Sequence, residues 1–71
     1  MIKKKKVLFP NLEAEMARNG ETQTYIAELL KSSVPTISRK LSGQTEWTIG
    51  DVEVLCEHFN IGYNELFLKN K

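Results

Sequence analysis

The polar side chains between residues 33 and 44 are the ones best suited to chemistry in this 71-residue chain. Arg39 can donate two hydrogen bonds to O6 and N7 of guanine, a pattern that no other base offers in the major groove. A surface ion pair with a carboxylate is the alternative for this arginine. Thr36 can donate to a base or place its methyl group against thymine, or it can be an ordinary first-turn residue of a helix. These side chains indicate a surface that contacts nucleic acid.

Other polar side chains in the same region suit phosphate better than bases. Gln23 opens a predicted helix, and the free N–H groups at a helix N-terminus attract phosphate. The further candidates for phosphate contact are Lys31, Ser33, Lys40, Ser42 and Gln44. Such contacts position a protein on DNA without carrying sequence information.

The sequence gives little support to catalysis or metal binding. Cys56 and His58 lie two residues apart on one predicted helix and therefore point to different faces. One cysteine and one histidine cannot build a typical zinc site. Glu53 and Glu57 are better explained as part of a solvated face than as an acid/base pair. We therefore expect no enzymatic activity, no metal site and no cofactor.

Length and composition predict one domain with one small core. Apolar residues make up 41% of the chain, which is enough for a compact fold. The single cysteine excludes an internal disulfide and suits a reducing cytosol, so we expect a cytoplasmic protein. No apolar run approaches the roughly 20 residues of a membrane-spanning helix. The apolar run after Lys3–Lys6 is also too short for a signal peptide.

Charge is distributed unevenly along the chain, although the net charge is only +1. Residues 1–40 hold eight Lys and Arg against four Asp and Glu, whereas residues 41–68 hold five Asp and Glu and no Lys or Arg. The first part could face phosphates while the second faces water or a protein partner. Four of the basic residues form the arm Lys3–Lys6, which could either contact DNA or only keep the chain soluble.

Hydrophobic spacing and capping residues predict five short helices around one core, with no convincing strand. The helices are expected to begin at Pro10 or Asn11, behind Thr22, after Ser32 or Ser33, after Thr48, and at Tyr63. Their expected ends are Asn19-Gly20, about residue 30, Ser42-Gly43, about His58 and about Leu68. Thr48 and Asp51 resemble a capping box with Asp in place of the usual Glu.

The same spacing separates a buried from an exposed side of these helices. The expected core residues are Leu12, Met16, Ile26, Leu29, Leu30, Ile37, Leu41, Ile49, Val52, Leu55, Phe59, Leu66 and Phe67. Ser38, Arg39 and Lys40 are expected to point away from the core. Trp47 is expected to pack beside the fourth helix rather than to stack on a base. Tyr25 could reach a phosphate or cover the first helix.

Taken in order, these elements resemble the lambda-repressor-like (Cro/repressor-type) helix-turn-helix family over about residues 11–68. The resemblance is carried by LEAEMAR at 12–18, QTYIAELL at 23–30, TISRKLSG at 36–43 and NELF at 64–67. Small phage or prophage regulators of Gram-positive bacteria are the most similar members. The resemblance implies an all-α, five-helix DNA-binding domain at 10–71 behind a flexible basic arm at 1–9, with the helix-turn-helix at about 22–42.

Single positions of the family can be matched to this sequence. Ser33, Val34, Pro35 and Thr36 match the start of the recognition helix, and Arg39 matches a position one turn further. The resemblance thus implies base contacts by Val34, Pro35, Thr36 and Arg39. Gln23 matches a glutamine that contacts the phosphate backbone. Ser42 and Gln44 match residues after the recognition helix that meet phosphates.

The sequence departs from the family pattern at three places. Lys31 stands where glycine is usual in the turn, and a lysine with positive φ there costs about 1 kcal/mol. Lys40 stands where an apolar residue is usual and is followed by Leu41, which implies a slight rotation of the recognition helix. Val34 and Pro35 replace polar side chains and could only touch a thymine methyl group or shape the fit.

The resemblance implies a sequence-specific, double-stranded DNA-binding transcriptional regulator, of the phage repressor type. Such a small domain would bind a palindromic operator as a homodimer, with dimer contacts from the fourth or fifth helix or formed only on DNA. One alternative is a protein-interaction module that has kept the fold without DNA binding, which the acidic second half allows. Another is an antitoxin that represses its own operon.

Overall fold

The computed structural model describes residues 7–69, and these residues form five helices without a strand. The helices are α1 (Pro10–Arg18), α2 (Gln23–Leu29), α3 (Val34–Ser42), α4 (Ile49–Phe59) and α5 (Tyr63–Leu66). The predicted all-α, five-helix architecture is thereby confirmed. The lysine arm lies outside the described residues.

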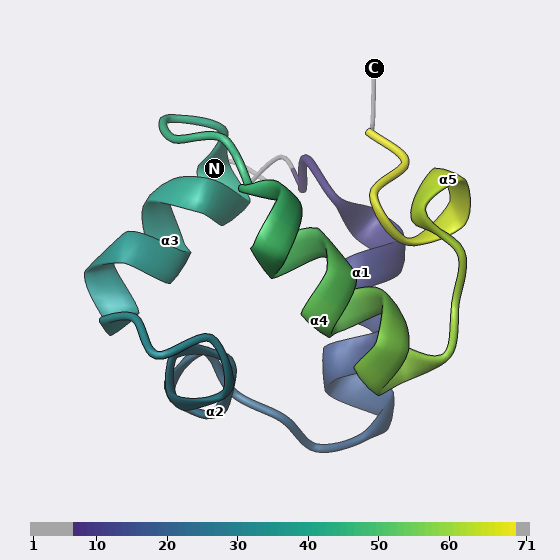
Figure 1. Cartoon of the computed structure of the whole chain (residues 1–71), viewed down its shortest axis with the longest axis horizontal. Helices are drawn as coiled ribbons and strands as arrows, with labels where there is room; N and C mark the ends of the chain where they lie inside the picture. The colour runs from purple at the N-terminus through teal and green to yellow at the C-terminus, as the bar shows by residue number, and fades with distance from the viewer. Residues whose placement is uncertain (1–6, 70–71) are drawn as a thin grey trace, which may run out of the picture.

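The helices pack in two groups that share one core (Figure 1). α2 packs against α3 on one side of the molecule, and α5 packs against both α1 and α4 on the other. In the view of Figure 1, α4 lies in front of α1 between these two groups. α3 therefore has one side toward the rest of the protein and one side toward solvent.

Polar side chains start three of the helices, at the positions expected from the sequence. The Thr22 hydroxyl accepts a hydrogen bond from the backbone N–H of Tyr25 at 3.3 Å and so begins α2. Ser33 accepts from the N–H of Thr36 and begins α3. Thr48 begins α4. These bonds satisfy backbone donors that have no partner inside the helix.

Gly43 ends α3 and lets residue 8 approach it closely. Its φ of 88° lies in the left-handed region, where a side chain is strained. A Cβ atom at this position would also come within 2.8 Å of Leu8 Cδ2. Glycine is therefore required here both by the backbone conformation and by the close packing of the segment before α1.

Each of the five helices contributes one fully buried aliphatic side chain to the core. These residues are Leu12, Ile26, Ile37, Leu55 and Leu66, all at 1% exposure or less. Leu29, Leu30, Val52 and Phe59 pack against them and are partly buried. Helices this short are marginal in isolation, so this shared core is what stabilises them.

Ile49 was expected in the core, and this expectation is wrong: the residue is 79% exposed. It is the first residue of α4, six positions before the buried Leu55. At about 100° per residue, six positions place Ile49 about 120° around the helix from Leu55, outside the buried side. Val52, only three positions away, lies on the buried side.

The boundary of the arm at residue 9 also needs correction. Phe9 is only 4% exposed and packs edge-on against Trp47 and Phe67, with ring centroids 6.3 and 6.1 Å away. Leu8 packs against the same core. The packed domain therefore begins before Pro10, because the apolar residues that precede the first helix are part of its core.

Candidate nucleic-acid interface

The turn between α2 and α3 depends on an unusual conformation of Lys31. Its φ is 57°, so the expected left-handed conformation is confirmed at a residue that is not glycine. The N–H of Ser32 donates to the carbonyl of Ala27 at 2.7 Å, and the N–H of Lys31 donates to that of Glu28. These bonds close the end of α2 and turn the chain directly into α3. The Lys31 side chain remains exposed.

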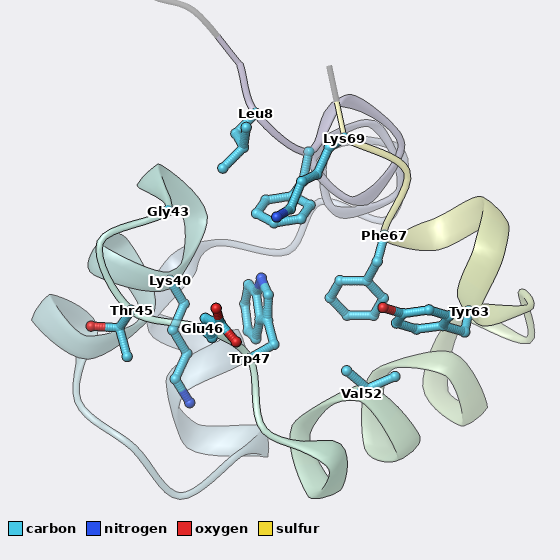
Figure 2. A pocket seen from close by; sticks show the side chains of 11 residues that line it. Leu8, Lys40, Gly43, Thr45, Glu46, Trp47, Val52, Tyr63, Phe67 and Lys69 are labelled. Carbon is cyan, nitrogen blue, oxygen red and sulfur yellow. The ribbon is translucent and has the colours of Figure 1, made fainter. Parts of the chain in front are cut away.

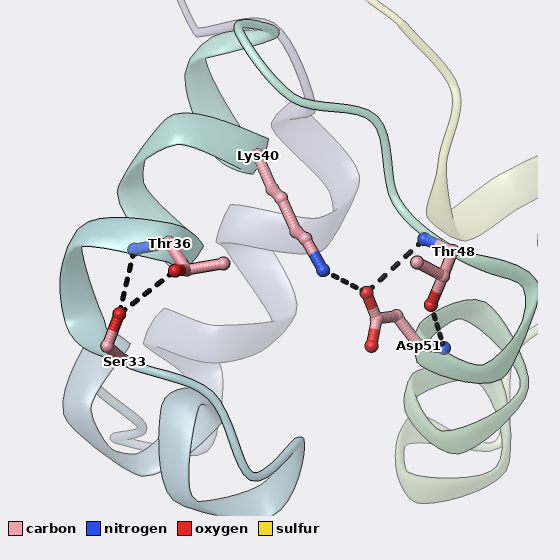
Figure 3. Close-up of polar contacts among 5 residues, drawn as sticks. All are labelled: Ser33, Thr36, Lys40, Thr48 and Asp51. Atoms are coloured by element: carbon pink, nitrogen blue, oxygen red, sulfur yellow. Dashed lines mark hydrogen bonds and ion pairs between the residues drawn. The ribbon is translucent and has the colours of Figure 1, made fainter.

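The first turn of α3 is organised by Ser33 and Thr36. Their hydroxyl oxygens lie 2.9 Å apart, and either can be the donor (Figure 3). Thr36 is half-buried, whereas Val34 and Pro35 are exposed. Pro35 falls in the first turn, where its missing N–H costs no hydrogen bond. The start of α3 thus presents two apolar side chains next to a fixed pair of hydroxyls.

An exposed stripe runs along α3. Its members are Pro35, Ser38, Arg39 and Ser42, which are spaced three or four residues apart and therefore share one face. No ion pair joins Arg39 to a carboxylate within residues 7–69, so the surface pairing considered for it is not formed there. Ser42 Oγ donates to the carbonyl of Arg39 at 3.1 Å. The arginine side chain is thus accessible on this face.

Several of the candidate phosphate contacts come together beside this stripe. Gln23, at the start of α2, lines a shallow depression of about 160 Å³ together with Ser38 and Ser42 of α3. Glu13 of α1 lines the same depression and brings a negative charge to it. Gln44 is exposed just beyond α3. The fold therefore brings Gln23 close to two donors that are distant in sequence.

Lys40 is not on the exposed face, and the expectation that it points away from the core is wrong. Only 6% of this residue is exposed, and its ammonium group forms an ion pair with Asp51 of α4. Its spacing explains the burial, because Lys40 follows the buried Ile37 by three residues and precedes Leu41 by one. We therefore remove Lys40 from the candidate phosphate contacts.

The Asp51 carboxylate is held by partners from both helices. Its Oδ2 atom accepts from the Lys40 ammonium and from the backbone N–H of Thr48, the latter at 3.3 Å (Figure 3). Burial would raise the pKa of Asp51, but the hydrogen bonds from Lys40 and Thr48 outweigh it and hold that pKa below its ordinary value of 3.8. The carboxylate is thus charged at neutral pH and neutralises the buried lysine.

Trp47 packs against the core as expected. Its ring lies edge-on to Phe67, with centroids 5.5 Å apart, and it is partly buried. The Lys40 ammonium lies 5.7 Å from the centroid of the indole. Figure 2 shows these three side chains around an open cavity of about 210 Å³, with Tyr63 beside Phe67 and Val52 near them. Core packing therefore accounts for Trp47 without a role in base stacking.

Tyr25 lies beside His58 of α4. Its ring centroid is 5.7 Å from that of His58, and His58 Nε2 is 2.8 Å from a carboxylate oxygen of Glu21. The hydrogen-bonded pair of His58 and Glu21 joins α4 to the segment before α2.

Comparison with known proteins identifies the family of this chain. The family model of the BetR domain matches residues 5–71. The chain belongs to the BetR-domain family. A solved structure of similar fold is a transcriptional regulator from Listeria innocua, with a TM-score of 0.75 and 27% sequence identity over 87% of this chain. The matched part spans 58% of the length of that chain. No curated protein matches the sequence.

The BetR-family match and the similar solved structure are both consistent with the five-helix fold. Membership of the lambda-repressor-like family remains a prediction. Within residues 7–69 of this BetR domain, no helix is long and apolar enough to cross a membrane. The same part of the chain contains no group of three or more metal-binding side chains. Burial raises the pKa of the Cys56 thiol, which keeps this BetR-domain cysteine protonated and poorly nucleophilic.

Proposed function

We propose that this BetR domain is a sequence-specific, double-stranded DNA-binding transcriptional regulator that places α3 in the major groove. The observation that carries the proposal is the exposed face of α3 with an accessible Arg39, set at a tight turn from α2. A helix packed across a second helix in this way fits the major groove, which admits one α-helix. The likeness to the Listeria innocua transcriptional regulator supports the same function.

Arg39 is the proposed source of sequence preference, through two hydrogen bonds to guanine. Val34 and Pro35 contribute apolar contact, which suits a thymine methyl group. Thr36 joins them, because its methyl group can face a base while its hydroxyl donates to Ser33. In that arrangement the Ser33 proton is free to bind a phosphate oxygen.

The remaining contacts are proposed to bind the phosphate backbone. They are made by Gln23, Lys31, Ser33, Ser42 and Gln44, all near the exposed face of α3. Ser42 must turn its hydroxyl away from the carbonyl of Arg39 to donate to phosphate. These contacts fix the position of the domain and leave sequence preference to Arg39 and its neighbours.

The finer proposal is a repressor of the phage type that binds a palindromic operator as a homodimer in the cytoplasm. Ile49 at 79% and Tyr63 at 59% exposure leave apolar surface on α4 and α5. In a homodimer formed through this surface, the two α3 helices would have to lie on neighbouring turns of the groove. The stoichiometry on a selected operator, measured by analytical ultracentrifugation, tests this point: one chain per operator would contradict it.

Selection of bound sites from a random DNA pool tests DNA binding itself. We expect one enriched motif and, in titrations, tighter binding to that motif than to a shuffled sequence at the same salt concentration. Arg39→Ala is the matched control, because it should abolish most of the enrichment without unfolding the domain. A pool that shows no enrichment with the parent protein would contradict sequence-specific binding.

A protein-interaction module without DNA binding is the second candidate. It is favoured by the exposed carboxylates of the second half, Glu46, Glu53, Glu57 and Glu65. If the protein binds no DNA sequence at low salt, the result would favour a protein-interaction module. An antitoxin that represses its own operon would bind DNA as well. A toxin gene next to the gene of this protein would distinguish the antitoxin from other DNA-binding regulators.

A further inference from the structure

Lys40 is the one charged or polar residue in the buried class among residues 7–69. It lies on α3 directly after Arg39, about 100° around the helix and on its inward side. A charged side chain at such a position is expensive to bury unless it is paired. Filling the core does not by itself explain why a lysine occupies this position.

The ammonium group of Lys40 connects the last turn of α3 to two side chains at the start of α4. One partner is Asp51, whose carboxylate also accepts from Thr48 in the capping box of α4. The other is the ring of Trp47, 5.7 Å from the ammonium. Because the Thr48 hydroxyl accepts in turn from the N–H of Asp51 at 3.1 Å, the carboxylate has little freedom to move. The pair is thus anchored at the rigid first turn of α4.

A small rotation of α3 would matter for the neighbouring Arg39. An atom about 6 Å from a helix axis moves by about 1 Å when the helix rotates by about 10°. Hydrogen bonds to base edges need a donor within a few tenths of an ångström of the best distance, so such a shift weakens them. The orientation of α3 about its own axis is therefore a condition for the proposed contact with guanine.

We propose that Lys40 is a positioning residue whose ion pair with Asp51 fixes the rotation of α3 and thereby aims Arg39. This inference rests on the proposed function. An apolar side chain of similar length could fill the same space, and replacing a buried ion pair by apolar groups is often neutral or stabilising. The charged pair is directional where an apolar contact is not, and this direction is what Lys40 adds.

Lys40→Met is the variant that tests the proposal, with Lys40→Arg as the conservative control. Each protein is titrated at several salt concentrations against the operator selected by the parent and against a shuffled sequence. For Lys40→Met we expect the preference for the operator to fall about tenfold, as for loss of one base contact. Binding to shuffled DNA and the slope of log affinity against log salt should not change. Lys40→Arg should recover most of the preference.

Two results would overturn the positioning role. If Lys40→Met keeps the full preference of the parent, the ion pair does not aim Arg39. If it weakens binding to both DNAs and makes the salt slope shallower by about 0.9, Lys40 contacts a phosphate instead. A general loss of folding would reduce both affinities in proportion to the unfolded fraction without changing the slope, and circular dichroism measures that fraction directly.

Residual dipolar couplings of the free protein give a readout that does not depend on DNA. In Lys40→Met, the couplings measured for α3 should no longer agree with the orientation that α3 has relative to α1 and α4 in the parent. The couplings of α1 and α4 should still agree with the parent orientation of these two helices. Couplings of α3 that fit the parent orientation would overturn the proposal.

Asp51→Asn provides a second variant, because its amide oxygen can still accept from the N–H of Thr48 while the carboxylate charge is lost. If the parent binds no DNA sequence selectively, the proposed function fails, and the couplings still decide whether the pair orients α3.

Discussion

At the scale of single residues, the proposed DNA contact depends most directly on Arg39. The side chain is exposed, and residues 7–69 offer it no carboxylate partner. Arg39→Ala should weaken binding to the selected operator by about 1–3 kcal/mol and relax the preference at one G·C pair. Arg39→Lys should keep part of the affinity but lose the preference, because an ammonium cannot make the paired contact of a guanidinium. Titration against operators that vary at each position tests both variants, and an unchanged preference in Arg39→Ala would assign the base contact elsewhere.

Lys31 gives a second prediction at this scale. With φ at 57°, the residue pays a steric cost of about 1 kcal/mol that glycine avoids. Part of the gain is lost, because glycine gives the unfolded chain more freedom. Lys31→Gly should therefore raise the free energy of unfolding by up to about 1 kcal/mol. Lys31→Ala removes the same side chain but keeps the strain, so its stability should not rise. A lower melting temperature for the glycine variant than for the alanine variant would contradict this account.

At the scale of elements, the sequence predicted the helices better than the faces that they bury. Thr22, Ser33 and Thr48 each mark a helix start through a local hydrogen bond, and local bonds can be predicted from neighbours in the sequence. Lys40 and Phe9 were placed wrongly because their partners lie in distant segments. The positive charge of Lys40 suggested solvent, and only the approach of Asp51 from α4 makes its burial possible. For the candidate site, the exposed stripe of α3 followed from helical spacing, whereas the proximity of Gln23 to Ser42 required the tertiary fold.

The start of α4 gives a prediction about acid stability. The folded state lowers the pKa of Asp51 below 3.8, so the folded protein binds a proton at this site less readily than the unfolded chain. The stabilisation is therefore present above the unfolded pKa and is lost as pH falls through the folded pKa. We expect the free energy of unfolding to fall from about pH 5 downward and Asp51→Asn to flatten this dependence. Glu53→Gln, on the exposed side of the same helix, is the control and should leave the slope near that of the parent. Equal slopes for Asp51→Asn and the parent would contradict the role of the ion pair.

At the scale of the whole molecule, the chain before α1 belongs partly to the fold. Phe9 contacts Trp47 and Phe67, which come from the loop before α4 and the end of α5. Removal of residues 1–9 should therefore cost about 3–5 kcal/mol, as expected for loss of a buried phenylalanine. Removal of residues 1–6 leaves Phe9 in place and should leave the melting temperature nearly unchanged. Thermal unfolding of the two truncated proteins compares them, and similar losses in both would show that the first six residues also stabilise the domain.

The same shorter truncation decides what the four lysines of the arm do. Charge is concentrated there, whereas residues 41–68 have no Lys or Arg, so the arm is the largest basic group in the chain. If it lies along DNA, its removal should weaken binding to operator and shuffled DNA together, because phosphate contacts carry no sequence information. The slope of log affinity against log salt should then become shallower by about 0.9 for each lysine that contacted a phosphate. Arg39→Ala in the full chain is the matched comparison, since it should reduce the preference for the operator far more than binding to shuffled DNA. If affinity and slope both stay at the values of the full chain, the arm makes no DNA contact and serves only to keep the protein soluble.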